Sequence, residues 1–347
     1  MFWTGERIVV AEGTAEGSLA DWASTWDTSL LGRKVLAFHL GDRQSGPLAF
    51  FTYIPCARRR DDEPRWRWWA RGALARVPVV GQHRVRTLLR DVDGHFHRSD
   101  TFRMVVGEGP QDWLCFNGER VGIGDYRVQP ANEPYQEWYG RTACIPLVID
   151  ADRRGHPPIH EHLAALEDAD AVLATVAEAG PYTAELGDVH LRDSQAVTGV
   201  ASSAAGAAPG RRLRGSVRDE GWTSLPNGSR ALAIGMGRRD IGPLIVLSRN
   251  PPGAVEAPAS TYRTEMLRLV LEGGLSVGDR RYRAGDWRLS DAGVAQGAVT
   301  HGPEGSVQLV LFADRQHCRP VEGDAMSGLD ALLGAVSLQL GRVHVAP

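Results

Sequence analysis

The chain has 347 residues, of which 43% are hydrophobic and 23% charged, and its formal net charge is −3. These values exclude a disordered or fibrous chain, and the near-neutral charge gives no support to binding of nucleic acid or an acidic membrane surface. We expect no membrane span and no signal peptide, because no window approaches about eighteen consecutive apolar residues and the N-terminal stretch lacks a basic region followed by an apolar run. The four cysteines form no CxxC pair, which is typical of reduced thiols in a cytoplasmic protein.

A duplication organises the chain. The segment 36–55 (LAFHLGDRQSGPLAFFTYIP) matches 232–251 (LAIGMGRRDIGPLIVLSRNP) without a gap, at an offset of 196. Two further pairs of segments follow in the same order, namely 98–109 over 263–274 at an offset of 165, and 124–136 over 285–297 at an offset of 161. Apolar runs separated by Gly-containing turns are typical of β-strands. The sequence therefore predicts two copies of one β-rich unit.

The first copy carries a long insertion. The fall in offset from 196 to 165 corresponds to 31 extra residues between Pro55 and His95, and the inserted region 56–94 contains three tryptophans among many arginines. An insertion of this length in a compact β unit is typical of a lid, a docking segment or a small cap. Its Trp and Arg side chains could stack on an aromatic ligand, or the tryptophans could anchor a loop on the barrel wall.

The two copies define the expected domains. The stretch 157–180 begins with two prolines, has apolar residues at helical spacing and ends at a glycine, which predicts a helix. The segment 329–340 predicts a terminal helix that would pack on a barrel or on a partner, such as a second copy of the chain. The expected divisions are an N-terminal barrel domain (1–150), a helical segment and linker (151–211), a C-terminal barrel domain (212–326) and a C-terminal helix and tail (327–347).

The second copy carries the clearest resemblance to a known family. Its core, RLVLEGGLSVGDRRYRAGDWRLSDAGVAQGAV (268–299), alternates apolar strands with Gly and Gly-Asp turns. In this pattern each copy resembles a cupin, a small antiparallel jelly-roll β-barrel, and the whole chain resembles a bicupin over about two-thirds of its length. The resemblance implies an all-β fold of two barrels with a few linking and terminal helices. It implies no single activity, because cupins carry very diverse chemistries.

The family's metal-binding pattern is incomplete in the first copy. That pattern is His-x-His, then Glu, then a later His, and alternate residues of a strand point to the same side. His95 and His97 are retained, whereas the glutamate position falls on Thr101 or Phe102 and the last histidine position on Tyr135. A third ligand could come from Asp100, Glu108 or Tyr135. We expect no resident metal, with iron or another divalent ion on His95 and His97 as the alternative.

In the second copy the pattern is absent. Ser260 and Tyr262 occupy the two histidine positions, Met266 or Leu267 the glutamate position, and Gln296 the last histidine position. None of these side chains binds divalent metals well. Tyr262 and Gln296 could orient a ligand, but we expect any reacting centre to lie in the first barrel, because only that copy has ionisable groups at the mapped inward positions.

The expected site in the first barrel suits proton transfer. A histidine can take up and return a proton near neutral pH, and a tyrosine can donate one. We therefore predict a metal-independent isomerase or cyclase acting on a small, largely apolar specialised metabolite such as a polyketide. Two alternatives stay open, an iron-dependent dioxygenase and a non-catalytic binding protein, and the histidines could also be purely structural. The candidate catalytic residues are His95, His97 and Tyr135, and the candidate substrate-binding residues are Thr101, Phe102, Arg103, Trp113, Tyr262 and Gln296.

Overall fold

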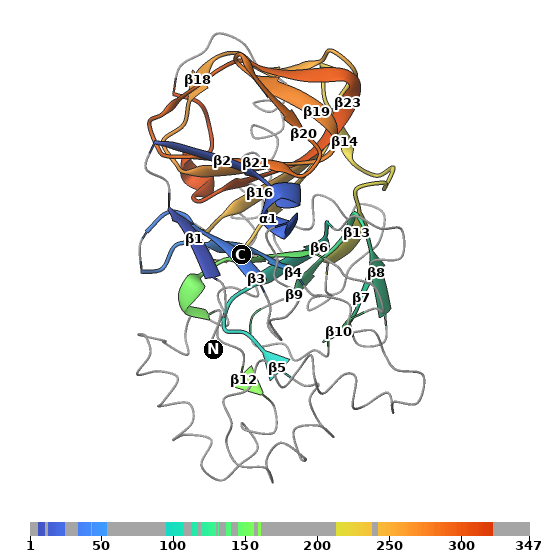
Figure 1. Ribbon diagram of the computed structural model, residues 1–347, viewed down its shortest axis with the longest axis vertical. Helices are drawn as coiled ribbons and strands as arrows, with labels where there is room; N and C mark the ends of the chain where they lie inside the picture. Colours follow the sequence, from blue (N-terminus) through green and yellow to red (C-terminus); the bar gives the residue numbers. More distant parts are fainter. Residues whose placement is uncertain are drawn as a thin grey trace, which may run out of the picture.

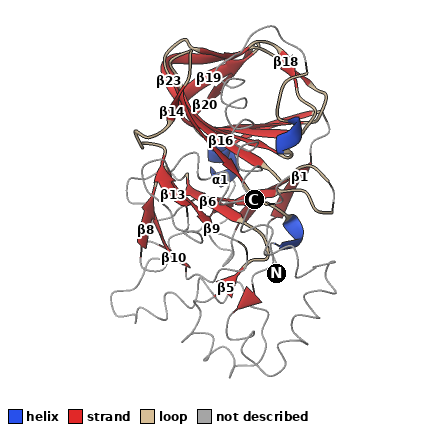
Figure 2. Ribbon diagram, turned by 180° about the vertical axis from the view of Figure 1, so that it is seen from behind, coloured by secondary structure: helices blue, strands red, loops and turns tan. Residues whose placement is uncertain are grey.

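A computed structural model shows two β-sheet barrels, one above the other in Figure 1. Strands dominate both (Figure 2), with one short α-helix, α1 (Leu19–Ser24), and two 3-10 turns among the described residues. No helix in the described part of the chain is long and apolar enough to cross a membrane. The structure describes residues 6–10, 13–24, 34–42, 44–53, 95–106, 113–116, 119–129, 131, 137–139, 145–155, 159–160, 213–237 and 242–321.

The first barrel is built on a seven-stranded sheet that is antiparallel except where its edge strand β1 runs parallel to β3. A three-stranded sheet and a two-stranded sheet complete it. In spatial order the large sheet contains β1 (Glu6–Val10), β3 (Lys34–His39), β4 (Leu48–Tyr53), β11 (Pro146–Asp150), β6 (Thr101–Val105), β9 (Asp125–Gln129) and β13 (Leu213–Ser216). The smaller sheets contain β10 (Glu137–Tyr139), β7 (Trp113–Phe116) and β8 (Glu119–Gly122), and β12 (Ile159–His160) with β5 (His95–Phe96).

The second barrel is built on a nine-stranded antiparallel sheet and one two-stranded sheet. The main path contains β14 (Thr223–Ser224), β15 (Arg230–Gly235), β16 (Leu244–Asn250), β23 (Val299–Phe312), β19 (Met266–Val277), β21 (Asp286–Ser290) and β2 (Thr14–Ser18). Off this path, β17 (Val255–Ala257) pairs with β23 and β20 (Arg280–Arg283) pairs with β19, while β18 (Ser260–Thr261) pairs with β22 (Ala295–Gln296).

The duplication predicted from the sequence is confirmed strand by strand. β3 and β4 correspond to β15 and β16 at the predicted offset of 196, and β6 corresponds to the start of β19 at 165. The correspondence continues beyond the matched segments, since each copy ends in a 3-10 turn, η1 (Arg153–Gly155) or η2 (Arg315–His317). Each turn begins with an arginine that donates to a carbonyl of its own barrel, Arg153 to Leu40 and Arg315 to Met236.

The two copies exchange one strand each. β2 pairs with β21 in the second barrel's sheet, and β13 pairs with β9 in the first barrel's sheet. The domain boundaries expected near residues 150 and 212 are therefore wrong for these two strands. Each exchanged strand places a glycine under an aromatic side chain, Gly17 under Trp287 and Gly215 under Tyr126, where a Cβ atom would come within 2.5 Å of the ring. An aromatic ring that covers a strand glycine fixes the pairing register.

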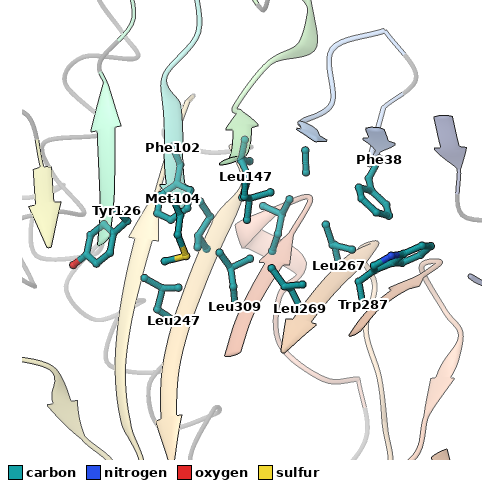
Figure 3. Packing of buried hydrophobic residues seen from close by; sticks show 14 of the residues in the cluster. Phe38, Phe102, Met104, Tyr126, Leu147, Leu247, Leu267, Leu269, Trp287 and Leu309 are labelled. Carbon is teal, nitrogen blue, oxygen red and sulfur yellow. The ribbon is translucent and has the colours of Figure 1, made fainter. Parts of the chain in front are cut away.

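The main hydrophobic core lies between the two sheets. Phe38, Phe102 and Met104 of the first barrel face Leu267 and Leu269 of the second (Figure 3). Phe38 also meets Trp287 edge-on, with 4.8 Å between ring centroids. Because side chains alternate across a strand, the residues between these core positions point into the barrels instead.

Several predicted segments lie outside the described residues. These are the insertion, the terminal helix and most of the predicted helix at 157–180, of which only Ile159 and His160 are described, as strand β12 rather than helix. Among the cysteines, Cys318 is free and buried, and burial raises the pKa of its thiol to about 12. That thiol is therefore unreactive at neutral pH.

Candidate functional site

The inner face of the first barrel is apolar on one side and cationic on the other. Directly paired residues across the sheet share a face, and one such row runs from Ala37 through Phe50 and Val148 to the arginines. Arg103 pairs with Arg127, and Arg127 pairs with Arg214. Arg103 and Arg127 are buried, so two guanidinium groups lie inside the barrel and a third stands at its edge.

His97 and Arg103, two of the predicted site residues, are in contact. The Nη2 atom of Arg103 lies 3.2 Å from Nε2 of His97, and both side chains are buried. A guanidinium can only donate hydrogen bonds, so Nε2 of His97 must accept. The ring is therefore neutral, with its proton on Nδ1.

A second polar pair lies further along the same face. The hydroxyl of Thr101 donates to the Asp150 carboxylate at 2.8 Å, and both residues are fully buried. Arg127 donates to the amide oxygen of Gln129 at 2.6 Å. The predicted site residue Thr101 therefore belongs to the inner wall, together with a carboxylate that the sequence did not indicate.

Phe102 and Asp100 do not line the inner wall. The pleat that turns Thr101 and Arg103 inward turns Phe102 outward, where it stacks on Tyr126 in the core between the barrels. The prediction of Phe102 as a substrate-binding residue is therefore wrong. Asp100 is no metal ligand, because its two carboxylate oxygens accept backbone N–H groups of Ala131 and Gly237.

The remaining candidates of the first barrel are described only in part. His95 lies in β5 directly opposite His160 of β12, and Trp113 begins β7. Their side chains lie outside the described residues, as does the whole of Tyr135 and Glu108. Their predicted roles stay predictions.

The described residues do not fit a divalent metal. No group of three or more His, Cys, Asp or Glu side chains in the described part of the chain could hold one. Nε2 of His97 is engaged by a guanidinium 3.2 Å away, and a cation in that position opposes a second cation on the same nitrogen.

In the second barrel the mapped positions do come together. Ser260 pairs with Gln296 across β18 and β22, and the Gln296 amide oxygen accepts from Arg288 at 3.2 Å and from Ser290 at 3.3 Å. Tyr262 is buried against Phe312, with 5.6 Å between ring centroids. Both side chains line the interior, and the expected ligand-orienting roles remain untested.

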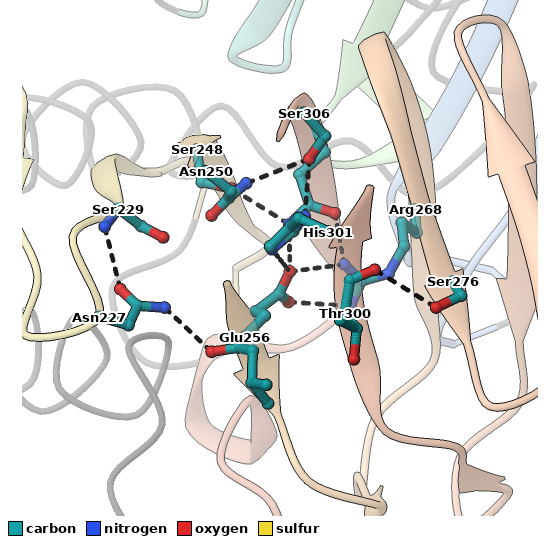
Figure 4. A network of polar contacts seen from close by, with 12 residues as sticks. Asn227, Ser229, Ser248, Asn250, Glu256, Arg268, Ser276, Thr300, His301 and Ser306 are labelled. Carbon is teal, nitrogen blue, oxygen red and sulfur yellow. Dashed lines mark hydrogen bonds and ion pairs between the residues drawn. The ribbon is translucent and has the colours of Figure 1, made fainter. Parts of the chain in front are cut away.

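The sequence mapping missed a buried charged cluster in this second barrel. Glu256 binds Arg268 through both carboxylate oxygens, each at 3.0 Å, and also accepts from Gln308 (Figure 4). Nε2 of His301 lies 3.5 Å from the same carboxylate. Glu256 and His301 place ionisable groups inside this barrel at strand positions outside those mapped from the family's metal-binding pattern.

The two barrels place different residues beside their equivalent arginines. Arg268 and Arg288 occupy the positions of Arg103 and Arg127. In the second barrel Glu256 binds Arg268, and Glu16 of the exchanged strand binds Arg288 at 2.5 Å. The residue paired with Arg127 on the exchanged strand of the first barrel is Arg214.

Comparison with known proteins extends to the fold only. No protein-family model matches the sequence, and no curated protein matches it. Among solved structures, salicylate 1,2-dioxygenase from Pseudaminobacter salicylatoxidans is 13% identical, over 86% of this chain and 83% of that chain, with a TM-score of 0.43. A variant of oxalate decarboxylase from Bacillus subtilis is 11% identical over 90% and 80%, with a TM-score of 0.41. A glyoxylate-induced protein from Pseudomonas aeruginosa is 14% identical over 89% and 91%, with a TM-score of 0.45.

The strand order decides the architecture. Two antiparallel jelly-roll barrels in tandem, related by an internal duplication, are present in the described residues. The fold is that of a bicupin. The first barrel carries buried arginines on its inner wall, and the second carries a buried cluster around Glu256 and Arg268.

Proposed function

We propose that the first barrel of this bicupin binds a small, largely apolar metabolite through an anionic or enolic oxygen, and isomerises or cyclises it by proton transfer without a metal. The contact between His97 and Arg103 carries the proposal. It holds a neutral imidazole beside a buried cation on the inner wall.

The division of the inner wall supports the substrate class. Ala37, Leu48, Phe50 and Val148 form a buried apolar cluster on one side, and Arg103 and Arg127 lie on the other side of the same face. An apolar body could contact the cluster while its oxygen accepts from a guanidinium. Hydrogen bonds between a charged group and its partner are worth about 1.5–3 kcal/mol, enough to fix the orientation of a ligand.

The tautomer of His97 supports an acid role for this residue. Since Nε2 accepts from Arg103, Nδ1 carries a proton that can be donated to an oxygen whose negative charge grows during enolisation. His97 is therefore better suited to stabilise an enolate than to remove the first proton. His95, two positions earlier in the chain and within β5, remains the candidate base, with Tyr135 as a second proton donor.

Deuterium exchange tests the proposal without the natural substrate. α-Tetralone is an apolar ketone whose α-protons exchange slowly at neutral pH, and mass spectrometry records deuterium uptake. We expect exchange above the buffer rate by protein treated with a chelator, and a loss of about 10²–10⁴-fold in His97→Phe, as for removal of a positioned acid. Gln296→Ala is the matched control and should retain the exchange. Absence of exchange in the wild type, or its loss on chelation, would overturn the proposal.

One observation favours the iron-dependent alternative. The backbone of His160 pairs with that of His95 across β5 and β12, so a third histidine lies on the strand next to His95. Elemental analysis of protein purified without chelator distinguishes the metal-independent proposal from the iron-dependent alternative. We expect well under one equivalent of iron, manganese, nickel or zinc, whereas a full equivalent that is lost in both His95→Ala and His160→Ala would establish the metal alternative.

A further inference from the structure

A hollow of about 660 Å³ opens on the second barrel, outside the site proposed above. Its wall is polar and carries charges of both signs, including Arg230, Glu272 and Glu304. Asn250 and Ser306 belong both to the lining of this hollow and to the hydrogen-bonded network inside the barrel. The hollow and the buried charged cluster therefore meet at these two residues.

Ser306 begins a chain of three side chains that runs inward. Its Oγ lies 2.7 Å from Nδ1 of His301, and Nε2 of His301 lies 3.5 Å from Oε2 of Glu256. Figure 4 shows His301 between the other two side chains. The contact with Glu256 is electrostatic and not a hydrogen bond, and a carboxylate favours a proton on the ring nitrogen that faces it. Nε2 therefore carries the ring proton and Nδ1 accepts the Ser306 hydroxyl. This is the order of a serine nucleophile, a neutral base and an orienting carboxylate.

The charges around the chain fit those roles. The bound Arg268 guanidinium and the Gln308 amide keep the pKa of Glu256 below its ordinary value against the effect of burial. Burial lowers the pKa of His301, an effect that Arg268 reinforces and Glu256 opposes. Glu256 is therefore ionised and His301 neutral at pH 7, so that the imidazole is able to accept a proton.

Ser306 borders the hollow but is itself largely buried, with 6% of its surface exposed. Its cross-strand partner on β19 is Gly273, at a break in register, and this glycine has a φ of +66°. A Cβ on Gly273 would lie 2.2 Å from the carbonyl oxygen of Gly305, so no other residue fits. Because paired residues share a face, no side chain of β19 stands beside the Ser306 hydroxyl at this position. On its other side Nδ2 of Asn250 lies 3.5 Å from the Ser306 hydroxyl, close enough to donate to an oxyanion forming beside it.

We propose that Ser306 is a nucleophile for acyl transfer and that the hollow binds small carboxylic esters. Oγ of Ser306 bonds to the ester carbonyl carbon while its proton passes to Nδ1 of His301, and the tetrahedral oxyanion accepts from Asn250. The carbon–alkoxide bond then breaks, and the leaving alkoxide takes the proton from Nδ1. A water molecule repeats the two steps on the acyl-serine, which releases the acid and restores the hydroxyl. Glu256 is a positioning residue that fixes the His301 ring.

Covalent labelling tests the nucleophile directly. A fluorophosphonate reacts with activated serines and forms a stable phosphonyl adduct, and peptide mapping locates it. We expect one adduct on Ser306 in the wild type, none in Ser306→Ala or His301→Gln, and an unchanged adduct in Ser248→Ala. Ser248 is the matched control, since it is a buried serine of the same network whose hydroxyl accepts from Gln308 and Asn250 and contacts no histidine in the described network.

Ester hydrolysis tests the base and its orientation. We expect hydrolysis of p-nitrophenyl acetate that falls at least 100-fold in Ser306→Ala and His301→Gln and about tenfold in Glu256→Gln, while Ser248→Ala has no effect. Because burial lowers the pKa of His301, hydrolysis should continue below pH 6.5. Glu256→Gln should shift the dependence of the hydrolysis rate on pH. Circular dichroism of each variant distinguishes loss of reaction from loss of fold. Peptide mapping of the labelled wild type locates the reactive serine without any substitution. An adduct elsewhere, no adduct, or full hydrolysis by Ser306→Ala would overturn the proposal.

Discussion

The Asp100 carboxylate of the first barrel accepts the backbone N–H of Gly237 in the second barrel at 2.9 Å. The reciprocal contact is also present, because Glu265, which corresponds to Asp100 at the offset of 165, accepts from the N–H of Gly41 at 2.9 Å. Gly41 and Gly237 correspond at the offset of 196, and both have positive φ. The two barrels are therefore joined by a symmetric pair of charge-assisted hydrogen bonds.

The first prediction concerns this pair. Asp100 is fully buried and also accepts from Ala131, so Asp100→Ala leaves two buried N–H groups without their acceptor. We expect a loss of about 2–4 kcal/mol in the free energy of unfolding, since each unsatisfied buried group costs about 1–3 kcal/mol. Glu265→Ala, at the less buried member of the pair, should cost under about 1.5 kcal/mol. Denaturant titration measures both values, and equal costs would contradict this account.

The second prediction concerns the buried pair in the second barrel. Glu256 and Arg268 are each at most 6% exposed, so removing one partner leaves the other charge buried. We expect Glu256→Ala or Arg268→Ala to cost about 3–5 kcal/mol, whereas the double variant Glu256→Leu with Arg268→Met should recover most of that loss. Chemical denaturation of the three proteins gives the comparison. A double variant that is less stable than both single ones would show that the pair contributes more than it costs to desolvate.

The third prediction follows from the lowered pKa of His301. Burial keeps the folded ring neutral, whereas the ring of the unfolded chain takes up a proton near pH 6.5. The unfolded state therefore binds more protons below pH 6.5, and stability should fall as the pH is lowered from 6.5 to the folded pKa. Glu256, whose pKa is also lowered, adds a further loss below about pH 4.5.

Thermal unfolding between pH 7 and pH 5 measures this dependence. His301→Gln should flatten it without removing it, because burial and Arg153 also lower the pKa of His39. His39→Gln is the matched variant, and the two substitutions together should flatten the slope further than either one alone. A slope unchanged by His301→Gln would show that the folded ring protonates normally.

The fourth prediction concerns the arginine row of the first barrel. We expect 1-naphthoate to bind more tightly than the neutral 1-naphthalenemethanol, by about tenfold to a hundredfold, since a charge-assisted hydrogen bond is worth about 1.5–3 kcal/mol. Arg127→Met should abolish the difference, and Arg288→Met in the second barrel should leave it intact. Isothermal titration calorimetry measures the six affinities of the two probes for the three proteins. Equal binding of both probes to the wild type would count against an anionic ligand.

The fifth prediction places the chemistry of the first barrel. Once a substrate is known, His97→Phe or Tyr135→Phe should lower turnover by about 10²–10⁴-fold, as expected for loss of a positioned acid or base. Gln296→Ala should have little effect, because Gln296 binds only Arg288, Ser290 and a backbone carbonyl among the described residues. Steady-state kinetics of these variants tests the prediction, with circular dichroism as the control for correct folding. Full activity in both His95→Ala and His97→Ala would mark these histidines as structural.

Much of the fold was predictable because duplication leaves a signal in the sequence. The gapless match at 36–55 and 232–251 fixed the positions of β3, β4, β15 and β16. The strand exchange was not predictable, because β2 and β13 share little more than a Gly-Ser pair, Gly17-Ser18 and Gly215-Ser216. Two residues carry no information on which sheet a strand will join.

The candidate site was predictable only where a strand pattern could be mapped. Thr101 and Arg103 are two residues apart on one strand, so both lie on the inner wall. The family pattern allowed its glutamate position to fall on either Thr101 or Phe102. The strand pleat excludes Phe102, because that side chain lies in the core between the barrels. Glu256 and His301 could not have been paired from spacing, because 44 residues separate them. Only the pairing of β17 with β23 brings them together.

The exchanged strands impose an order on synthesis of the chain. A ribosome completes β2 long before β21, its partner at Asp286–Ser290, and the first barrel lacks its edge strand until Leu213–Ser216 has emerged. Neither barrel can therefore close while the chain is still short, and contacts so distant in sequence form slowly. Until β21 has been synthesised, strand β2 has no partner, and its backbone N–H and C=O groups stay unpaired. Strands in that state pair readily with other chains, so newly made protein should depend more on chaperones than a chain whose barrels each close on themselves.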